Sequence, residues 1–395
     1  MPQVFVCTGE VSGDLQASYL IRALLRLRPD LTITAVGGQR MAAAGAKLLY
    51  DTTGISSMGL IEALPFIGAA LWTMRKIRRF VGQNSLDLAI LVDYIGINNG
   101  VSQLLKQAGI PVVYYIAPQE WVWQSNRFLS YQLAERTRLM VAIFPAEARH
   151  YEAAGANVRW VGHPLLDILR DVPTRVEARQ TLGIPSDQIQ VVLVPASRPQ
   201  EVRLILPVLL ETAYLLSQRI PEIQFQLPVA SAQLRPAIQR CVERFRHRYG
   251  LVVTLVSDPT NQRQLLAASD LVLAKSGTVN LETAILGIPQ VVIYRLNPIT
   301  YWLGKHILKV RVPFMSPPNL VVMRGIVPEF LQKQAQPAIL AQTAEALLTD
   351  PQRQAQLQQD YAEMRQALGS VGVLERASQA ILRVLDDGKQ ISSGR

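Results

Sequence analysis

The chain has few of the features that mark a secreted or membrane-spanning protein. It contains only two cysteines in 395 residues, Cys7 and Cys241, so we expect no disulfide framework, and a reducing cytoplasm fits. No uninterrupted apolar run reaches the roughly 18 residues that a transmembrane helix needs. The chain enters its first apolar segment, residues 4–7, without a basic leader or cleavage site, so we expect no signal peptide. These absences favour a protein of the cytoplasm or of a membrane surface.

Motifs of several common function classes are also missing. The sequence has no helix-turn-helix signature, zinc-ligand spacing or RNA-binding aromatic motif, which argues against a nucleic-acid partner. It has no Asp-x-Asp and only four scattered histidines, so we expect neither a metal site nor another cofactor. The loop after the first apolar segment does not fit G-x-G-x-x-G, so the dinucleotide fingerprint fails as well.

The composition is that of a folded protein with an anionic partner. Apolar residues make up 49% of the chain and charged residues 18%, which excludes a disordered protein. Forty Lys and Arg against thirty Asp and Glu give a net charge of +10, which favours binding to anions. Because the nucleic-acid motifs are missing, an anionic membrane surface and phosphorylated substrates remain as the favoured partners.

Short apolar runs alternate with helical patterns, which predicts parallel sheets covered by helices. We expect strands at residues 4–8, 32–36, 88–92, 112–115, 140–144 and 158–161, then at 191–194, 224–228, 252–256, 271–274 and 290–294. The predicted fold is α/β, with two Rossmann-like, doubly wound domains that face a cleft. Their expected bounds are 1–167 and 168–336, followed by a helical region, 337–387, and a frayed tail, 388–395. The helical region would pack either on the first domain or on a second subunit, which leaves a homodimer open.

The segment around residues 271–286 predicts an anion site. A buried strand runs into the turn Ser276-Gly277-Thr278, which opens a helix. Free N–H groups and the helix dipole favour negative charge at such an end. Glu282 follows one turn later, where its carboxylate can accept hydrogen bonds from sugar hydroxyls. Phosphate beside hydroxyls indicates a nucleotide diphosphate; the alternative is that Ser276 and Thr278 simply cap the helix.

Two early strand-to-helix loops predict contacts to a sugar substrate. The first loop is Gly9-Glu-Val-Ser-Gly-Asp14, and the second contains Gly37-Gly38. Glycine allows a ligand to approach the backbone closely. A plain turn is the alternative, with Ser12 or Asp14 as the cap of the helix.

Asp93 is the candidate general base. It ends the apolar strand 88–92 at the carboxyl edge of the sheet, and Asn98 follows, where it can orient a sugar or a water. If a glycosyl group passes to a hydroxyl, a base must take the proton. The alternative role of Asp93 is an N-cap for the next helix.

Arg198 is the candidate for stabilising a leaving diphosphate. Its planar guanidinium suits phosphate oxygens, and it follows the first strand of the second domain. A fixed cation there would act mainly in the transition state. Alternatively, Arg198 pairs with Glu201 only to brace the loop.

Two helices combine cations with apolar side chains on the face away from the core. Such interleaving is typical of an anionic lipid interface, although a solvated basic face is the alternative. The first helix, residues 65–81, offers Leu71, Trp72, Arg75, Lys76, Arg78 and Arg79. The second, residues 301–311, offers Trp302, Lys305 and Lys309.

Taken in order, these motifs resemble those of the lipid-A-disaccharide synthases, bacterial inverting glycosyltransferases of the GT-B type. The matching residues are Gly9, Glu10, Ser12, Gly13, Asp14, Val36, Gly37, Gly38, Met58, Gly59, Glu62, Pro118, Trp121, Trp123, Gly162, His163, Ser197, Arg198, Glu201, Ser276, Gly277, Thr278, Glu282, Pro318, Asn319 and Leu320. The family's Asp-Ala-Pro-Asp-Phe-Asn element reads Asp93-Tyr-Ile-Gly-Ile-Asn98 here, and its Pro-Gly-Ser-Arg turn reads Pro195-Ala-Ser-Arg198.

The resemblance implies transfer from UDP-2,3-diacylglucosamine to 2,3-diacylglucosamine 1-phosphate, at the inner face of the inner membrane. The products would be a β-1′,6-linked disaccharide 1-phosphate and UDP. It adds Ser197 to the UDP site, adds Met58, Glu62 and Asn319 to the sugar contacts, and makes Glu10 a second catalytic carboxylate. A non-catalytic sugar-nucleotide or lipid-binding relative and a nucleotide-sugar epimerase are the alternatives.

Overall fold

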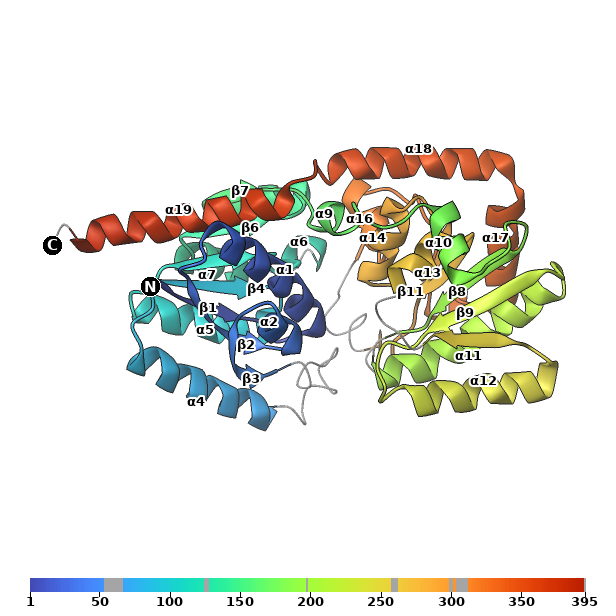
Figure 1. Cartoon of the computed structure of the whole chain (residues 1–395), viewed down its shortest axis with the longest axis horizontal. Helices are drawn as coiled ribbons and strands as arrows, with labels where there is room; N and C mark the ends of the chain where they lie inside the picture. The colour runs from blue at the N-terminus through green and yellow to red at the C-terminus, as the bar shows by residue number, and fades with distance from the viewer. Residues whose placement is uncertain are drawn as a thin grey trace. The chain divides into compact units, whose positions relative to one another are not determined.

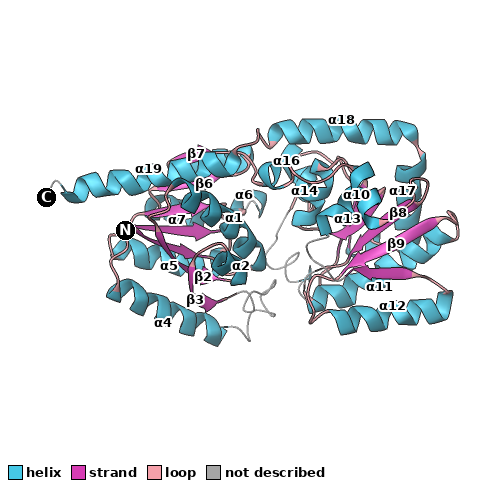
Figure 2. Cartoon of the chain, viewed as in Figure 1, coloured by secondary structure: helices cyan, strands magenta, loops and turns pink. Residues whose placement is uncertain are grey.

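The computed structural model describes residues 1–52, 67–123, 128–196, 198–256, 262–297, 301–302 and 312–393. Its contacts divide the chain into two compact units (Figure 1). Unit 1 comprises Met1–Asp167 and Leu368–Arg395, and unit 2 comprises Ile168–Leu308 and Val312–Ala367. Figure 2 shows that each unit is a sheet with helices on both sides of its strands. The predicted α/β class with two doubly wound parallel sheets is confirmed.

Unit 1 contains a parallel sheet of seven strands in the order β3-β2-β1-β4-β5-β6-β7. The strands are β1 (Gln3–Cys7), β2 (Thr32–Gly37), β3 (Lys47–Asp51), β4 (Leu88–Val92), β5 (Val112–Tyr115), β6 (Leu139–Ala142) and β7 (Val158–Trp160). All five residues of β4 are buried and apolar, as expected for an inner strand covered on both faces. The strand order reverses between β1 and β4, and ligands of doubly wound sheets bind at the carboxyl ends of such a pair.

The helices of unit 1 cover both faces of this sheet. They are α1 (Val11–Leu27), α2 (Gln39–Ala43), α4 (Ile67–Gln83), α5 (Ile95–Gln107), α6 (Glu120–Trp123), α7 (Phe128–Arg136), α8 (Pro145–Ala153) and α19 (Val373–Ser393), with α9 (Leu165–Ile168) at the boundary. Ile77, Val101 and Leu133, from α4, α5 and α7, pack with Phe5 and Leu91 in one buried cluster. The C-terminal helix α19 lies along α1 (Figure 1).

Unit 2 contains a parallel sheet of six strands in the order β10-β9-β8-β11-β12-β13. The strands are β8 (Ile189–Val194), β9 (Ile223–Pro228), β10 (Val253–Val256), β11 (Leu271–Lys275), β12 (Gln290–Tyr294) and β13 (Glu329–Leu331). The helices are α10 (Arg175–Leu182), α11 (Pro199–Ser217), α12 (Arg235–Tyr249), α13 (Gln262–Ala268), α14 (Thr278–Ile285), α16 (Pro317–Val322), α17 (Pro337–Thr349) and α18 (Pro351–Ala367), with a 3₁₀ turn at Gln332–Gln334. The order reverses between β8 and β11, which makes their carboxyl ends the second expected ligand edge.

All eleven predicted strands are present, and two more were missed. β3 and β13 are edge strands whose residues are mostly half-buried, so their apolar signal is weak. The helical region predicted as one piece, residues 337–387, is divided between the units, because α17 packs on α11 and α19 packs on α1. The last helix also continues to Ser393, past the predicted start of the tail at Gly388.

Within the ranges given above, none of the helices combines the length and apolarity that crossing a membrane requires.

Candidate active sites at the carboxyl edges of the two sheets

Two carboxylates and a hydroxyl meet at the carboxyl edge of the sheet in unit 1. Glu10 and Ser12 belong to the loop and first turn after β1, and Asp93 follows β4, the neighbouring strand. The Ser12 hydroxyl lies 3.4 Å from Oε2 of Glu10 and 3.5 Å from Oδ2 of Asp93. The Ser12 hydroxyl therefore lies between the two carboxylates, and the three predicted residues lie together.

The turn that carries Asp93 is strained. Asp93 and Tyr94 have φ angles of 51° and 28°, where side chains of L-residues are disfavoured by about 1–3 kcal/mol each. Two buried side chains hold the turn through the Asp93 carbonyl: the Tyr114 hydroxyl donates to it at 2.8 Å, and the Asn98 amide donates at 3.1 Å. Asn98 thus supports the backbone, whereas Asp93 does not cap α5, whose N-cap is Tyr94. Strain maintained by buried partners is typical of functional sites.

The surroundings of Asp93 bring its pKa closer to neutral pH. Burial, followed by the nearby charge of Glu10, raises the pKa of Asp93 from 3.8 to about 6. Hydrogen bonds from the Tyr94 backbone and from Ser12 oppose this change. A carboxylate with such a pKa is ionised at pH 7 and is a stronger base than an ordinary aspartate.

Asp14 has a structural role. Its buried carboxylate accepts hydrogen bonds from the backbone N–H groups of Gly38 at 2.9 Å, Met41 at 3.1 Å and Arg40 at 3.3 Å. It therefore holds the N-terminus of α2, where a negative charge is favourable. The suggestion that Ser12 or Asp14 caps α1 is wrong, since the N-cap of that helix is Glu10 and no side chain caps it.

Close packing explains two of the glycines predicted to contact a sugar. A Cβ atom on Gly13 would overlap with the Thr8 hydroxyl, and one on Gly37 would overlap with the sulfur of Met41. At these two positions the fold itself requires glycine, whether or not a ligand approaches.

Cations and a carboxylate meet at the carboxyl edge of the sheet in unit 2. Arg198 is the N-cap of α11, which follows β8, and Glu201 lies in the first turn of that helix. Lys275 ends the neighbouring strand β11 and places its ammonium 3.0 Å from Oε1 of Glu201, whereas the guanidinium of Arg198 is 3.9 Å from that atom. The other Glu201 oxygen, Oε2, is buried without a hydrogen-bond partner in the part of the chain described. Arg198 therefore does pair with Glu201, but Lys275, which the sequence analysis missed, is the nearer cation.

The turn before α14 has the predicted form but a different cap. Asn280 Oδ1 accepts the N–H of Gly277 at 2.7 Å, while the Ser276 hydroxyl donates to the Met315 carbonyl. Capping by Ser276 or Thr278 is therefore wrong, and the exposed Thr278 opens the helix. A Cβ atom on Gly277 would have no atom of the described residues within 4 Å, so none of these residues crowds this turn.

Glu282 lies one turn further along α14 and is buried. Its Oε1 is 3.7 Å from the Nε of Arg263, and burial raises the pKa of Glu282 above its ordinary value while Arg263 opposes the change. A buried carboxylate with one long ion pair keeps acceptor capacity for the hydroxyls of a ligand.

Asn319 is engaged within the protein. Its amide nitrogen donates to the Val327 carbonyl at 3.0 Å and to Glu329 at 3.1 Å. Its oxygen accepts the N–H groups of Ile326 at 2.7 Å and of Val327 at 2.8 Å. All of its hydrogen-bonding groups are used, so Asn319 holds the loop before β13 and is not kept as a sugar contact.

The residues predicted to contact a membrane are partly outside the described ranges. On α4, Leu71 is 61% exposed and Trp72 is 51% exposed, while Ile77 is buried. The Lys76 ammonium lies 3.7 Å from the centre of the Trp72 ring, a cation–π contact that keeps a cation beside the exposed aromatic. Trp302 is exposed. Ser197, Met58, Glu62, Lys305 and Lys309 lie outside the residues that the structure describes.

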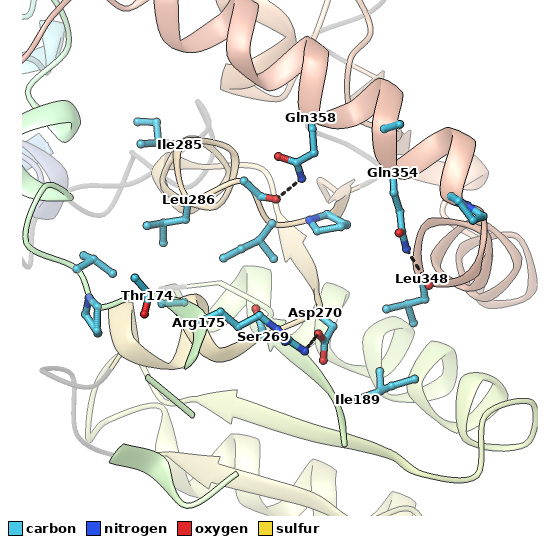
Figure 3. A pocket seen from close by; sticks show the side chains of 18 residues that line it. Thr174, Arg175, Ile189, Ser269, Asp270, Ile285, Leu286, Leu348, Gln354 and Gln358 are labelled. Carbon is cyan, nitrogen blue, oxygen red and sulfur yellow. Dashed lines mark hydrogen bonds and ion pairs between the residues drawn. The ribbon is translucent and has the colours of Figure 1, made fainter. Parts of the chain in front are cut away.

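A pocket of about 790 Å³ in unit 2 lies at the opposite edge of the sheet, at the amino ends of β8 and β11 (Figure 3). Its charged pair is Arg175 with Asp270, and Asp270 also accepts the Gln190 N–H at 2.8 Å. The Gln358 amide donates to the Gly287 carbonyl at 2.7 Å. These polar groups already have partners, and ligands of doubly wound sheets bind at the carboxyl edge, so this pocket is not the candidate site.

Among the residues described, no cluster of His, Cys, Asp and Glu side chains has an arrangement that could hold a metal ion.

Comparison with known proteins shows the family of the chain. The model of the family "Lipid-A-disaccharide synthetase" matches residues 4–384. A lipid-A-disaccharide synthase of Gloeothece citriformis is 46% identical over 386 residues, which cover 96% of this chain and 99% of that protein. A lipid-A-disaccharide synthase of Synechocystis is 42% identical and covers 96% of this chain and 97% of that protein.

Solved structures of other enzymes share the fold at low identity. The S. aureus MnaA–UDP co-structure has a TM-score of 0.69 at 12% identity and covers 98% of this chain and 97% of that one. The UDP-GlcNAc 2-epimerase of Neisseria meningitidis, bound to UDP-GlcNAc, has a TM-score of 0.64 at 14% identity and covers 97% of this chain and 100% of that one. These likenesses support the fold alone, whereas the sequence matches extend over nearly the whole chain. The chain belongs to the lipid-A-disaccharide synthetase family.

Proposed function

We propose that the protein transfers 2,3-diacylglucosamine from UDP-2,3-diacylglucosamine to 2,3-diacylglucosamine 1-phosphate with inversion and without a metal ion. The 6-hydroxyl oxygen of the acceptor attacks C1 of the donor sugar, and the bond from C1 to the UDP oxygen breaks. The hydroxyl proton passes to a carboxylate of the enzyme. The products are the β-1′,6-linked disaccharide 1-phosphate and UDP.

The observation that carries the proposal is the pair Asp93 and Glu10 at the carboxyl edge of unit 1. A base must be ionised at working pH and basic enough to accept a hydroxyl proton, and burial beside Glu10 gives Asp93 a pKa of about 6. The Ser12 hydroxyl lies between the two carboxylates, and the charge of Glu10 helps to raise the pKa of Asp93. Asp93 is the proposed base, and Ser12 with the Gly9 loop faces the acceptor sugar.

The edge of unit 2 supplies the groups that the UDP diphosphate needs. Arg198 and Lys275 provide two cations, and the N-terminus of α14 provides N–H groups and the positive end of a helix dipole. Glu282, with its one long ion pair, provides an acceptor for hydroxyl groups of the nucleoside, and Glu201 holds the two cations in place. As the bond to C1 breaks, negative charge grows on the diphosphate, and fixed cations then stabilise the transition state more than the ground state.

Product analysis tests this function. Purified protein is incubated with both substrates, and the lipid product is identified by mass spectrometry while UDP release is followed. We expect one disaccharide 1-phosphate per UDP, and no UDP without the acylated acceptor. UDP-dependent interconversion of the donor without acceptor would instead indicate an epimerase, and binding without turnover would indicate a non-catalytic relative.

We propose further that the protein meets its acylated substrates on an anionic leaflet, at the inner face of the inner membrane. The helix α4 has four cations, no carboxylate, and the exposed Leu71 and Trp72. The sequence analysis missed a second basic helix, α12, which has five exposed arginines and one glutamate. Together these helices carry a net +8 of the chain's +10. Each cation near an anionic surface contributes about 1 kcal/mol.

Sedimentation with vesicles tests the membrane contact. Binding should require anionic lipid and weaken at high salt without vanishing, because the apolar side chains add a contribution that salt does not screen. Replacing Leu71 and Trp72 with Ser should remove that residual binding and leave UDP affinity unchanged. Val176→Ser, at an apolar position that is 62% exposed on α10, is the matched control. Equal binding to neutral and anionic vesicles would contradict the proposal.

A further inference from the structure

The ring of Tyr94 occupies a slot that exists because two neighbouring residues lack side chains. A Cβ atom on Gly9 would overlap with Cδ1 and Cε1 of the ring. A Cβ atom on Gly96 would lie 2.6 Å from Cζ and 2.7 Å from the hydroxyl oxygen. Real Cβ atoms do not approach other atoms so closely, so the ring and a side chain at either position exclude each other.

The backbone gives no other reason for glycine at these two positions. Gly9 and Gly96 are not among the residues with positive φ, so their conformations are open to other amino acids. Tyr94 itself has the unfavourable φ of 28°. The half-buried ring lies between the loop after β1 and the first turn of α5.

The slot around the Tyr94 ring is formed by the same segments that carry the two carboxylates. Gly9 directly precedes Glu10, and Tyr94 directly follows Asp93. The contact between Gly9 and Tyr94 therefore lies one residue away from each of the two carboxylate-bearing positions. The titratable groups that interact electrostatically with Asp93 are Glu10 from the loop before α1, Tyr114 from β5 and Glu147 from α8.

We infer that Tyr94 is a positioning residue whose ring, seated on Gly9 and Gly96, fixes the Glu10–Asp93 pair in its working arrangement. The inference rests on the proposed function insofar as Asp93 is the base. The ring and not the hydroxyl performs this role, because most of the overlap with Gly9 and Gly96 involves ring carbons.

The test compares Tyr94→Phe, Tyr94→Ala and Gly96→Ala in the full-length protein. Tyr94→Phe keeps the ring and should retain kcat/KM within about threefold, whereas Tyr94→Ala should lower it by about 10²-fold, the usual effect of misplacing a catalytic group by about 1 Å. In Tyr94→Ala the acid limb of the pH profile should also move to lower pH, because Asp93 becomes less buried and Glu10 is no longer fixed beside it. A purely structural role would lower activity and leave the acid limb in place.

Coupling between the two positions gives a second, independent measurement. Gly96→Ala should displace the ring and lower kcat/KM, but adding it to Tyr94→Ala should cause no further loss, because the ring is already gone. Gly82→Ala in α4, where a Cβ atom would meet nothing within 4 Å, is the control for replacing a helical glycine. Additive losses, or an equal loss in Tyr94→Phe and Tyr94→Ala, would overturn the inference.

A measurement without substrate separates this inference from the proposed function. The pH dependence of unfolding reports the titration of Asp93 whether or not the protein makes the disaccharide. If the wild type forms no product, the function fails, and a shift of the unfolding profile in Tyr94→Ala relative to Tyr94→Phe still supports the role of the ring. Identical unfolding profiles for these two variants would contradict the role of the ring. If Tyr94→Ala does not fold, the pH dependence of thermal unfolding of Gly96→Ala, compared with that of Tyr94→Phe, serves instead.

Discussion

The two carboxyl edges of this protein are built alike in topology and opposite in charge. In unit 1 the groups that meet are Glu10, Ser12 and Asp93, two acids around one hydroxyl on strained backbone. In unit 2 they are Arg198 and Lys275 around Glu201, beside the N-terminus of α14. The same reversal of strand order thus gathers carboxylates in one unit and cations in the other, and we propose that the first edge takes a proton and the second binds the diphosphate.

The difference shows that the loops after the strands, and not the sheets, decide the chemistry. Both edges collect residues from two adjacent parallel strands, β1 with β4 and β8 with β11. Burial of like charges makes a carboxylate basic, whereas a cation next to a carboxylate keeps both groups charged. Each side of this comparison can be tested separately by a single substitution.

The largest expected effect is on turnover when the proposed base is changed. Asp93→Asn keeps the shape of the side chain and suits the left-handed backbone, but it cannot accept a proton. Turnover should fall by ~10²–10⁴-fold, while UDP binding measured by calorimetry stays the same. Full activity in this variant would transfer the role of base to Glu10 or Glu62.

The next effect in size concerns the cation of the other edge. Arg198→Ala should lower kcat by about 10²-fold, as is typical when one fixed charge donor to a transition state is removed. Arg198→Lys should restore only part of the rate, because the bidentate fork is lost. Arg219→Ala, which removes an exposed arginine paired with Glu345, is the control. Near-normal turnover in Arg198→Ala would take Arg198 out of the site.

A smaller effect is expected on nucleotide affinity. Glu282→Ala should weaken UDP binding by about 1.5–3 kcal/mol, the range for a hydrogen bond with a charged group. Isothermal calorimetry with UDP alone measures this, and Asp93→Asn serves as the variant in which UDP affinity persists. Unchanged affinity would return Glu282 to packing against Arg263.

The last expected effect is on the pH dependence of stability, and it reports the burial of charge at the edge of unit 1. The pKa of Asp93 is about 6 in the folded protein against 3.8 ordinarily, so between these pH values the folded state binds more protons than the unfolded state. Stability should therefore decrease as pH rises from about 4 to 6, by up to about 3 kcal/mol. Asp93→Asn removes this loss, so the variant should be more stable than the wild type at pH 8 but not at pH 4. Urea unfolding at both pH values measures it; a less stable variant at pH 8 would contradict the proposed burial of charge.

Much of this structure could be predicted from the sequence because its signals are local. Eleven strands were identified from buried apolar runs, and the positions of Asp93, Arg198 and Ser276 just after such runs placed them at a sheet edge. The edge strands β3 and β13 were missed, because a strand with one exposed side has no continuous apolar run. Lys275 was missed as well, since an isolated lysine after a strand carries no pattern of its own.

The roles of individual polar residues could not be predicted in the same way. Asp14 and Asn319 fit a sugar site by type and position, yet both are engaged by backbone groups of their own unit. Whether a polar side chain is available to a ligand depends on partners far along the chain, and the sequence does not reveal which N–H groups will lie within hydrogen-bonding distance.

The sequence by itself determined the α/β class, the parallel strands, the ordered motifs and the excess of positive charge, because each depends on the periodicity or spacing of nearby residues. The tertiary structure alone decided which of these residues meet. It brought Glu10 close to Asp93, which lies 83 residues further along the sequence. It also placed Lys275 beside Glu201 and the Tyr94 ring against two glycines. The physical reason is that pairing of parallel strands brings distant loops to one edge, where burial and charge set the chemistry of each group.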